Sequence, residues 1–207
     1  DALLASGATI SEINAVRTHC SAIKGGRLAA ATQPATVHCL VVSDVVGNDL
    51  ATIASGPFVP DPTTDADAQD VLDRYDCEVP AAVADRLARG AAGEVDETPT
   101  AGDPAFESVA TTIIGDGMTA VRAAADRASE AGFEPLVLSS RVRGEAREAA
   151  KTQVAITEEM RASGEPLDPP AVVVSGGETT VTVDGDGTGG PNQEFVLSAA
   201  VELAGGV

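Results

Sequence analysis

Residues 109–140 read VATTIIGDGMTAVRAAADRASEAGFEPLVLSS, and this stretch decides the fold class. Two apolar runs, 109–115 and 133–140, enclose an alanine-rich segment, 118–132, that is long enough for about four helical turns. Parallel strands need a long crossover between them, and a helix usually supplies it. The stretch therefore predicts two parallel strands joined by a helix.

The same alternation extends outward in both directions. The C-terminal half predicts a helix over 143–163, strands over 171–177 and 178–183, and a helix over 192–204. The N-terminal half predicts a helix over 9–31 that Gly25 and Gly26 interrupt, a buried strand over 36–43, a long loop over 44–64, short helices over 65–75 and 80–89, and a linker over 96–106. We expect an α/β fold with parallel or mixed sheets flanked by helices in Rossmann-like layers, covering parts of two domains.

Composition and charge exclude several classes of protein. The chain has 32 acidic and 13 basic residues, a formal charge of −19, and no apolar run of membrane-spanning length. Such a surface repels nucleic acid and anionic lipid, so we expect no nucleic-acid or membrane partner and a cytoplasmic protein. Three widely spaced cysteines indicate neither a disulfide framework nor a zinc site.

The acidic, lysine-poor composition is also typical of proteins from salt-loving organisms. Dense carboxylates repel one another, and molar salt screens that repulsion. We expect the free energy of unfolding to rise steeply from low to molar salt, which chemical denaturation at several salt concentrations would measure. Equal stability at low ionic strength would contradict the hypothesis.

Two polar segments of the N-terminal half are candidates for ligand binding. Lys24 and Arg27 flank two glycines, so these cations could hold a carboxylate or a phosphate, or they could cap the end of a helix. Ser43 and Asp44 directly follow the buried strand, where an aspartate can hold Mg²⁺ or accept a proton, although an ordinary Asx turn fits equally well. A third, weaker signal is the SGP turn that begins at Ser55.

The fourth candidate is VVVSGGETTVTVDGDGTGGPNQE, residues 172–194, which we interpret as two glycine-rich turns flanking a strand. Gly185, Gly187 and Gly190 match the GxGxxG pattern of dinucleotide sites. The strand before them alternates polar and apolar residues, however, whereas a dinucleotide fold starts from a buried apolar strand. The two histidines, His19 and His38, have no spacing that specifies a catalytic triad, which favours structural roles.

Taken together, these segments resemble the glycerate 2-kinase family with a MOFRL domain, some of whose members carry the label hydroxypyruvate reductase. The resemblance rests on LLASGATISEINAVRTHCSAIKGGRLA, LVVSDVVGNDLATIASGPFVPDPTT, GEAREAA and SGGETTVTVDGDGTGGPNQE, in that order. It implies ATP-dependent, Mg²⁺-assisted phosphoryl transfer to the 2-hydroxyl of D-glycerate in a cleft between two α/β domains. A homo-oligomer is compatible with the sequence.

The resemblance also implies roles for individual residues. Lys24 and Asp44 would be catalytic, with Asp44 as metal ligand or base and Asp49 as a second metal ligand. Substrate binding falls to Lys24, Arg27, Ser43, Ser55 and Gly56. Nucleotide binding falls to two loops, one formed by Ser175, Gly176, Gly177, Glu178 and Thr179, the other by Gly189, Gly190, Asn192, Gln193 and Glu194.

The chain departs from the family pattern at named positions. Pro191 stands where the family commonly has arginine in GGRNQE, and RTHCS at 17–21 replaces RKHLS, which removes a lysine. We expect residues 1–100 to be the C-terminal part of the family's kinase domain and 106–207 to begin a truncated second domain. Other family segments would then lie outside the sequence, and this piece alone would lack kinase activity.

Two other functions are compatible with the same residues. A hydroxypyruvate reductase would need NAD(P)H and a true dinucleotide turn, and its signature would be loss of NAD(P)H absorbance with hydroxypyruvate. A non-catalytic module that binds small anions would bind glycerate without ATP. Formation of ADP from D-glycerate, ATP and Mg²⁺ distinguishes the kinase from both.

Overall fold

The computed structural model describes residues 2–205, and the chain separates into two compact units. The first unit comprises Asp1–Val41 and Asp49–Ile114, and the second comprises Val42–Asn48 and Gly115–Val207. The α/β fold class is confirmed, because parallel strands flanked by helices are present. No helix among the described residues is both long and apolar enough to cross a membrane. The predicted division of the chain near residues 100–106 stays a prediction.

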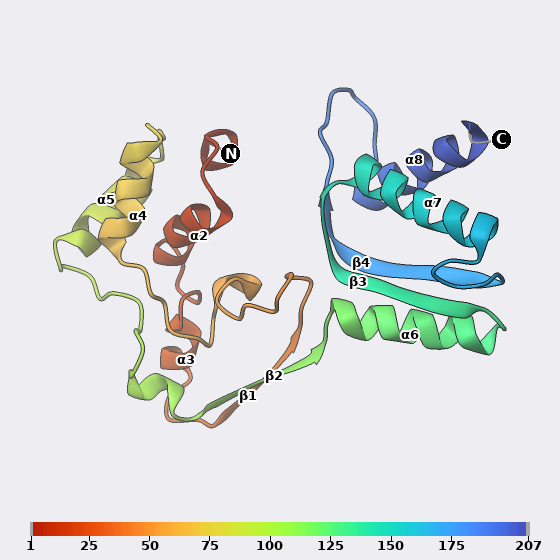
Figure 1. Cartoon of the computed structure of the whole chain (residues 1–207). Coiled ribbons are helices and arrows are strands. Elements are labelled where there is room, and N and C mark those ends of the chain that lie inside the picture. The colour runs from red at the N-terminus through yellow and green to blue at the C-terminus, as the bar shows by residue number, and fades with distance from the viewer. Residues whose placement is uncertain (1, 206–207) are drawn as a thin grey trace. The chain divides into compact units, whose positions relative to one another are not determined.

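The first unit is mainly helical around a small apolar core (Figure 1). Helices α2 and α4 both begin with a capping box, formed by Thr9 with Glu12 and by Thr64 with Asp67, which satisfies backbone donors at each helix start. The elements of this unit are α1 (Ala2–Ala5), α2 (Ile10–His19), α3 (Arg27–Ala31), β1 (Val37–Val42), η1 (Ile53–Ser55), α4 (Asp65–Arg74), α5 (Ala81–Ala91), η2 (Pro104–Phe106) and β2 (Val109–Gly115), of which β1 and β2 end in the second unit.

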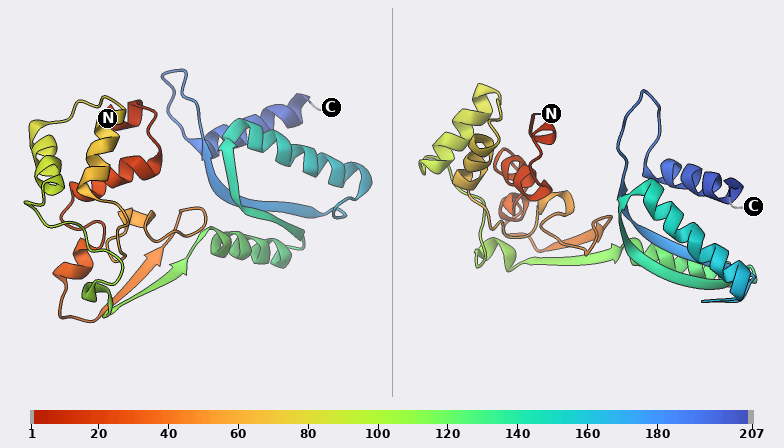
Figure 2. Two further views of the ribbon diagram at one scale, coloured as in Figure 1. Left: turned by 60° about the vertical axis from the view of Figure 1, so that its left-hand side comes forward. Right: turned by 45° about the horizontal axis from the view of Figure 1, so that its top comes forward.

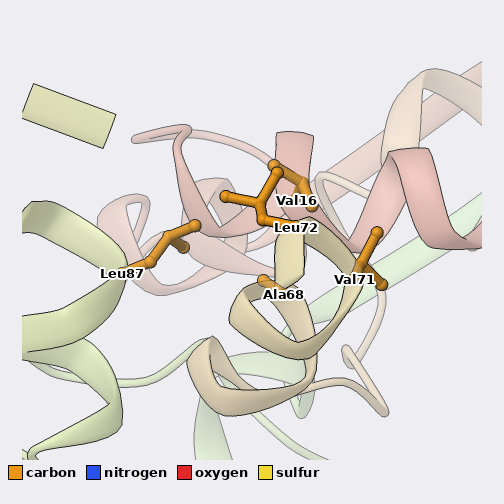
Figure 3. Close-up of a cluster of buried hydrophobic side chains, with 5 residues drawn as sticks. All are labelled: Val16, Ala68, Val71, Leu72 and Leu87. Carbon is orange, nitrogen blue, oxygen red and sulfur yellow. The ribbon is translucent and has the colours of Figure 1, made fainter. Parts of the chain in front are cut away.

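The core of the first unit lies where three helices meet. Val16 of α2 packs with Leu72 of α4 and Leu87 of α5, and Ala68 and Val71 complete the cluster (Figure 3). Leu87 is 1 % exposed, and burying a leucine of this kind stabilises a fold by roughly 1.5–3 kcal/mol. These contacts hold α2 and α4 together, which fixes the positions of the residues at their ends.

The second unit is a layered β/α structure. Strands β3 (Glu134–Glu145) and β4 (Ala171–Thr180) pair in parallel, α6 (Gly117–Glu130) lies on one face, and α7 (Ala146–Ser163) and α8 (Pro191–Gly205) lie on the other (Figures 1 and 2). Small and apolar side chains on α6 and α7, among them Val121, Ala150 and Val154, are buried. The strand, helix, strand order predicted from residues 109–140 is confirmed, but the two strands do not pair with each other: β2 pairs with β1, and β3 pairs with β4.

Two details of the sequence-based prediction are wrong. The predicted helix over 9–31 is two helices, because α2 ends at His19 and α3 begins at Arg27, and the N–H groups of Gly25 and Gly26 between them donate to a loop. No strand covers 178–183; β4 instead runs through Gly176 and Gly177 to Thr180, where it stays paired with β3. Within the predicted linker over 96–106, Thr98 is 3 % and Ala105 5 % exposed, whereas the other residues are exposed or half-buried, and the role of the segment as a linker stays a prediction.

Candidate functional site

A cavity of about 760 Å³ lies within the second unit, at the ends of β1 and β2, beside β3 and β4, and at the start of α6. In open α/β sheets, ligands bind beyond the carboxyl ends of the strands, so the ends of β1 and β2 are an expected place for a site. Its lining includes residues from five segments of the chain: Ser43, Asp44 and Asn48; Asp116 and Gly117; Ser140 and Arg141; Ser175, Gly176, Gly177 and Glu178; and Asn192. We call it the strand-end pocket.

The loop after β1 forms one wall of the strand-end pocket. Ser43 is 4 % exposed and its hydroxyl accepts from the Val45 N–H at 3.3 Å, which holds the loop in an Asx-like turn, while Asp44 beside it is exposed. Gly47 and Asn48 both have positive φ, so the chain turns sharply there. The side-chain amide of Asn48 then donates to Asp116 Oδ2 at 2.7 Å.

Asp116 is the N-cap of α6 and an anion of the pocket. Its carboxylate accepts from the Thr119 N–H and hydroxyl, both at 2.8 Å, and from Asn48. These hydrogen bonds, with the Thr119 backbone N–H the strongest influence, lower the pKa of Asp116 from 3.8 to about 2. The carboxylate is therefore ionised at neutral pH, and it lies at the positive end of the helix.

Arg141 reaches the pocket because β3 is irregular at this point. The pairing of β3 with β4 shifts register between Val137 and Ser139 and again between Ser139 and Val142, so Ser140 and Arg141 are bulged out of the ladder. Bulges often re-aim side chains beside functional sites. One guanidinium nitrogen of Arg141 would lie 3.6 Å from a β-carbon at Gly47, which places the charge against the loop after β1. Arg141 is the cation among the described lining residues.

The double glycine at 176 and 177 lies inside a strand and is not a turn. A β-carbon on Gly177 would overlap the backbone of Val142 in β3, and one on Gly176 would lie 3.0 Å from Val121 of α6. Glycine is therefore required for the close packing of β4 against β3 and α6. The interpretation of residues 175–179 as a phosphate-binding loop is wrong in form, although Ser175, Gly176, Gly177 and Glu178 do line the pocket.

The residues of the second predicted glycine loop line two different cavities. Asn192, near the start of α8, lines the strand-end pocket, whereas Gly189, Gly190, Gln193 and Glu194 line a separate cavity of about 680 Å³. Glu194 also pairs with Arg147 at 3.0 Å, and the Ser175 hydroxyl donates to Gln153 of α7 at 2.9 Å. Thr179 is half-buried in β4 and lines neither cavity.

Lys24 and Arg27 belong to the first unit. The Lys24 ammonium donates to the Ala54 carbonyl at 3.2 Å and to the Ser55 hydroxyl at 3.3 Å. Arg27 donates to the Thr18 and Ser21 carbonyls, at 2.9 and 3.0 Å, and its burial lowers the pKa of the guanidinium. Arg27 thus satisfies carbonyls at the C-terminal end of α2, as a helix-capping cation does.

The glycines between these two cations are tightly packed. The Gly25 N–H donates to the Ser55 carbonyl at 3.0 Å and the Gly26 N–H to the Gly56 carbonyl at 2.8 Å. Both glycines have positive φ, and a β-carbon on Gly26 would lie 2.6 Å from the ring of Phe106. The two amides are therefore used in docking the SGP turn and are not available to an anion.

The SGP turn itself has an uncommon backbone. Ala54, Ser55 and Gly56 all have φ between 53° and 61°, so three consecutive residues are left-handed. Such conformations cost about 1–3 kcal/mol each for residues other than glycine and gather at functional sites. The Lys24 contacts hold this turn in place. The carboxylate of Asp49, which stays a predicted metal ligand, accepts from the Thr52 hydroxyl at 2.6 Å and the Ala51 N–H at 3.2 Å, and the Thr52 hydrogen bond lowers its pKa.

Sequence reasoning missed the residues that complete the strand-end pocket. Asp116 and Gly117 follow β2 in the same way that Asp44 follows β1, so the strand-Asp-Gly-helix order at 109–117 was the available signal. Asn48 and Arg141 had no such signal. Their places depend on a positive-φ turn and on a register shift, neither of which the sequence pattern predicts.

Two sequence models match the chain, the domain of unknown function DUF4147 over residues 1–88 and the MOFRL family over residues 171–206. A glycerate 2-kinase of Pyrococcus horikoshii is 43 % identical over 207 residues, which cover 99 % of this chain and 46 % of that protein. The crystal structure of glycerate kinase from Thermotoga maritima matches with a TM-score of 0.82 and 42 % identity, over 98 % of this chain and 46 % of that one. The chain is therefore similar to glycerate 2-kinases over nearly its whole length, and residues 171–206 match the MOFRL family.

Similarity to these relatives does not transfer the activity of a whole relative to this chain. A protein of Agrobacterium vitis named "Putative hydroxypyruvate reductase" is 47 % identical over 99 % of this chain and 45 % of its own length. The chain thus spans about half the length of the relatives it matches. The names of the relatives support glycerate kinase chemistry for that family.

Proposed function

We propose that this chain serves a glycerate 2-kinase, in which ATP phosphorylates the 2-hydroxyl of D-glycerate with the help of Mg²⁺. The observation that supports this most directly is the strand-end pocket, which is lined by Arg141, by the start of α6 and by polar residues that follow β1 and β2. Helix N-termini and arginine are the usual protein partners of phosphate groups. A volume of about 760 Å³ is also in the range of pockets that hold small ligands.

The charge of the pocket favours a nucleotide that enters together with a metal. Asp44, Asp116 and Glu178 are acidic, and Arg141 alone offsets them among the described lining residues. A free triphosphate would be repelled by this excess of carboxylates. Carboxylate and phosphate oxygens are, however, the ligands that Mg²⁺ prefers, so Asp44 and Asp116 fit a metal that bridges to the phosphates. When bound, the metal would neutralise charge on the triphosphate.

The chain's own residues would act mainly by positioning. In the transfer, the 2-hydroxyl oxygen of glycerate bonds to the γ-phosphorus, the bond from that phosphorus to the β,γ-bridging oxygen breaks, and ADP leaves. The hydroxyl proton passes to a carboxylate, for which Asp44 is our candidate because it is exposed beside the pocket's turn. Such reactions depend on orientation and electrostatic stabilisation rather than on a covalent nucleophile.

Our predicted substrate contacts remain Lys24, Arg27, Ser43, Ser55 and Gly56. Our predicted second metal ligand remains Asp49. Lys24 is the strongest of these, since its ammonium holds the left-handed turn at Ala54 and Ser55 and is half-buried rather than enclosed. Cytoplasmic location, a homo-oligomeric state and lack of kinase activity in this piece alone also remain predictions.

Binding and turnover are tested separately because we expect the isolated chain to be inactive. Calorimetry of this chain should detect Mg-ATP binding that Arg141→Gln weakens at least tenfold, because the pocket loses its cation. Arg143→Gln, an exposed neighbour that does not line the pocket, is the matched control and should leave binding unchanged. Equal binding by both variants would place the nucleotide elsewhere.

Turnover is tested in the longer protein. With D-glycerate, ATP and Mg²⁺, formation of ADP and 2-phosphoglycerate is expected, and Asp44→Asn should abolish it. Turnover by the isolated chain at the rate of the longer protein would refute the predicted inactivity.

The reductase has one observation in its favour, the name of the Agrobacterium vitis relative. The GDGTGG segment, however, begins five residues after the end of β4, at Thr180, whereas a dinucleotide turn directly follows its strand. Oxidation of NAD(P)H by hydroxypyruvate in the longer protein, without ADP formation from glycerate, would replace the kinase proposal. Glycerate binding without ATP binding would indicate the anion-binding module.

A further inference from the structure

A buried cluster of possible metal ligands lies in the first unit, apart from every residue assigned above. His19 ends α2, Asp65 begins α4, and Glu97 comes from the segment before β2. One ligand atom from each residue lies within 4.8 Å of the other two. His19 is 1 % exposed and Asp65 is fully buried, while the Glu97 side chain is 39 % exposed and opens the cluster to solvent.

The histidine ring is held in one orientation. Its Nδ1 lies 2.9 Å from the Ala15 carbonyl oxygen, which can only accept, so Nδ1 carries the hydrogen. Its Nε2 lies 3.3 Å from Glu97 Oε2. A neutral ring would then direct a lone pair at a carboxylate, which is unfavourable. The Thr98 hydroxyl lies 3.4 Å from the same Nε2 and 3.5 Å from the Thr63 carbonyl oxygen, and its one hydrogen can be donated to only one of them. A cation between Nε2 and Glu97, either a proton or a metal ion, would remove the repulsion.

The environment of Asp65 distinguishes between a proton and a metal ion. One of its oxygens, Oδ1, accepts from Arg86 at 3.0 Å, whereas Oδ2 is buried with no hydrogen-bond partner among the described residues. Leaving a buried charged oxygen unpaired is costly. A proton on His19 would satisfy Glu97 only. A metal ion held by all three side chains would also engage the carboxylate of Asp65.

The spacing of two of the three ligands, His19 and Glu97, fits a small divalent metal. Bonds of about 2.0–2.1 Å at tetrahedral angles place neighbouring ligand atoms about 3.3–3.4 Å apart, close to the 3.3 Å between His19 Nε2 and Glu97 Oε2. Metal-binding histidines commonly donate their second ring N–H to a backbone carbonyl, as His19 does to Ala15. The Asp65 backbone N–H donates to the Glu97 carboxylate at 2.9 Å, which orients that ligand in turn.

We propose that His19, Asp65 and Glu97 bind one divalent first-row transition-metal ion of the zinc type. The mixed imidazole and carboxylate donors favour such a metal over Mg²⁺, which prefers oxygen ligands. The ion joins α2, α4 and the segment before β2, and water completes its coordination on the exposed side of Glu97. Its role is to stabilise the first unit, independently of phosphoryl transfer in the second.

Zinc binding to the whole chain tests the proposal. After treatment with a chelator, calorimetry with ZnCl₂ should show one equivalent bound, and the thermal midpoint should rise with free Zn²⁺, because a ligand of the folded state stabilises it by mass action. His19→Gln and Glu97→Gln should each weaken the affinity at least tenfold. His38→Gln, which changes the exposed histidine of β1, should bind as the wild type does.

Two further variants keep the result interpretable. Glu97 is partly exposed, so Glu97→Gln should retain the circular dichroism spectrum even if His19→Gln unfolds. Cys20→Ser removes the thiol next to His19 and should leave zinc affinity unchanged. Absence of saturable binding, equal affinity in the Glu97→Gln protein, or loss of binding in Cys20→Ser would each overturn the proposed site.

Discussion

Two of the chain's four double glycines, at residues 25–26 and 176–177, have different structural roles. Gly25 and Gly26 are buried, have left-handed backbones, and use both N–H groups on the SGP turn. Gly176 and Gly177 are strand residues that leave a cavity beside them. In both places a side chain would collide with neighbouring atoms. A glycine pair therefore indicates close backbone approach, and only the space beside it indicates a ligand.

The largest expected effect comes from the first pair. Gly26→Ala adds a methyl group 2.6 Å from the Phe106 ring at a φ of +77°, so left-handed strain and overpacking combine to cost roughly 2–5 kcal/mol. Gly93 has a φ of +74° with nothing within 4 Å, so Gly93→Ala should cost only about 1–2 kcal/mol. Urea unfolding of both variants measures the difference. Equal losses would show that backbone conformation alone requires Gly26.

The second pair should respond in both stability and binding. The β-carbon of Gly177→Ala would meet the Val142 backbone, which cannot rotate away as a side chain can, and we expect a loss of about 2–5 kcal/mol. Displacement of β3 would also move Arg141, so Mg-ATP affinity should fall. Gly185→Ala, in open space, should change stability by less than about 0.5 kcal/mol. Wild-type nucleotide affinity in Gly177→Ala would contradict the packing argument.

A third comparison concerns the cation beside the first pair. Arg27 donates to two carbonyls near the end of α2, so Arg27→Gln should cost about 1–2 kcal/mol in urea unfolding. Arg17→Gln, an exposed residue of α2, should be nearly neutral. If Arg27→Gln instead leaves stability unchanged and raises the KM for glycerate in the longer protein, Arg27 is a substrate clamp and not a cap.

Much of the fold was predictable from local pattern, and the pocket only in part. The strand and helix alternation at 109–140 and the position of Asp44 after a strand follow from periodicity, and both are observed. The continuation of β4 through Gly176 was not predictable, because it depends on pairing with a bulged partner strand. Arg141 reaches the pocket through that bulge, and the cluster at His19 joins residues 46 and 32 positions apart in the chain. Long-range contacts of this kind leave no spacing in the sequence.

The smallest expected effect is a pH dependence at the wall of the strand-end pocket. Asp116 has a folded pKa of about 2 against 3.8, so it stabilises the fold above pH 3.8, and this contribution is lost as the pH falls through about 2. Carboxyl carbon shifts measured by NMR should give its midpoint directly. Asn48→Ala removes one donor and should raise that midpoint, whereas Gly185→Ala should not. An unchanged midpoint in Asn48→Ala would show that the hydrogen bond from Asn48 does not affect the pKa of Asp116. The hydrogen bonds at the N-terminus of α6 would then be sufficient to keep Asp116 ionised.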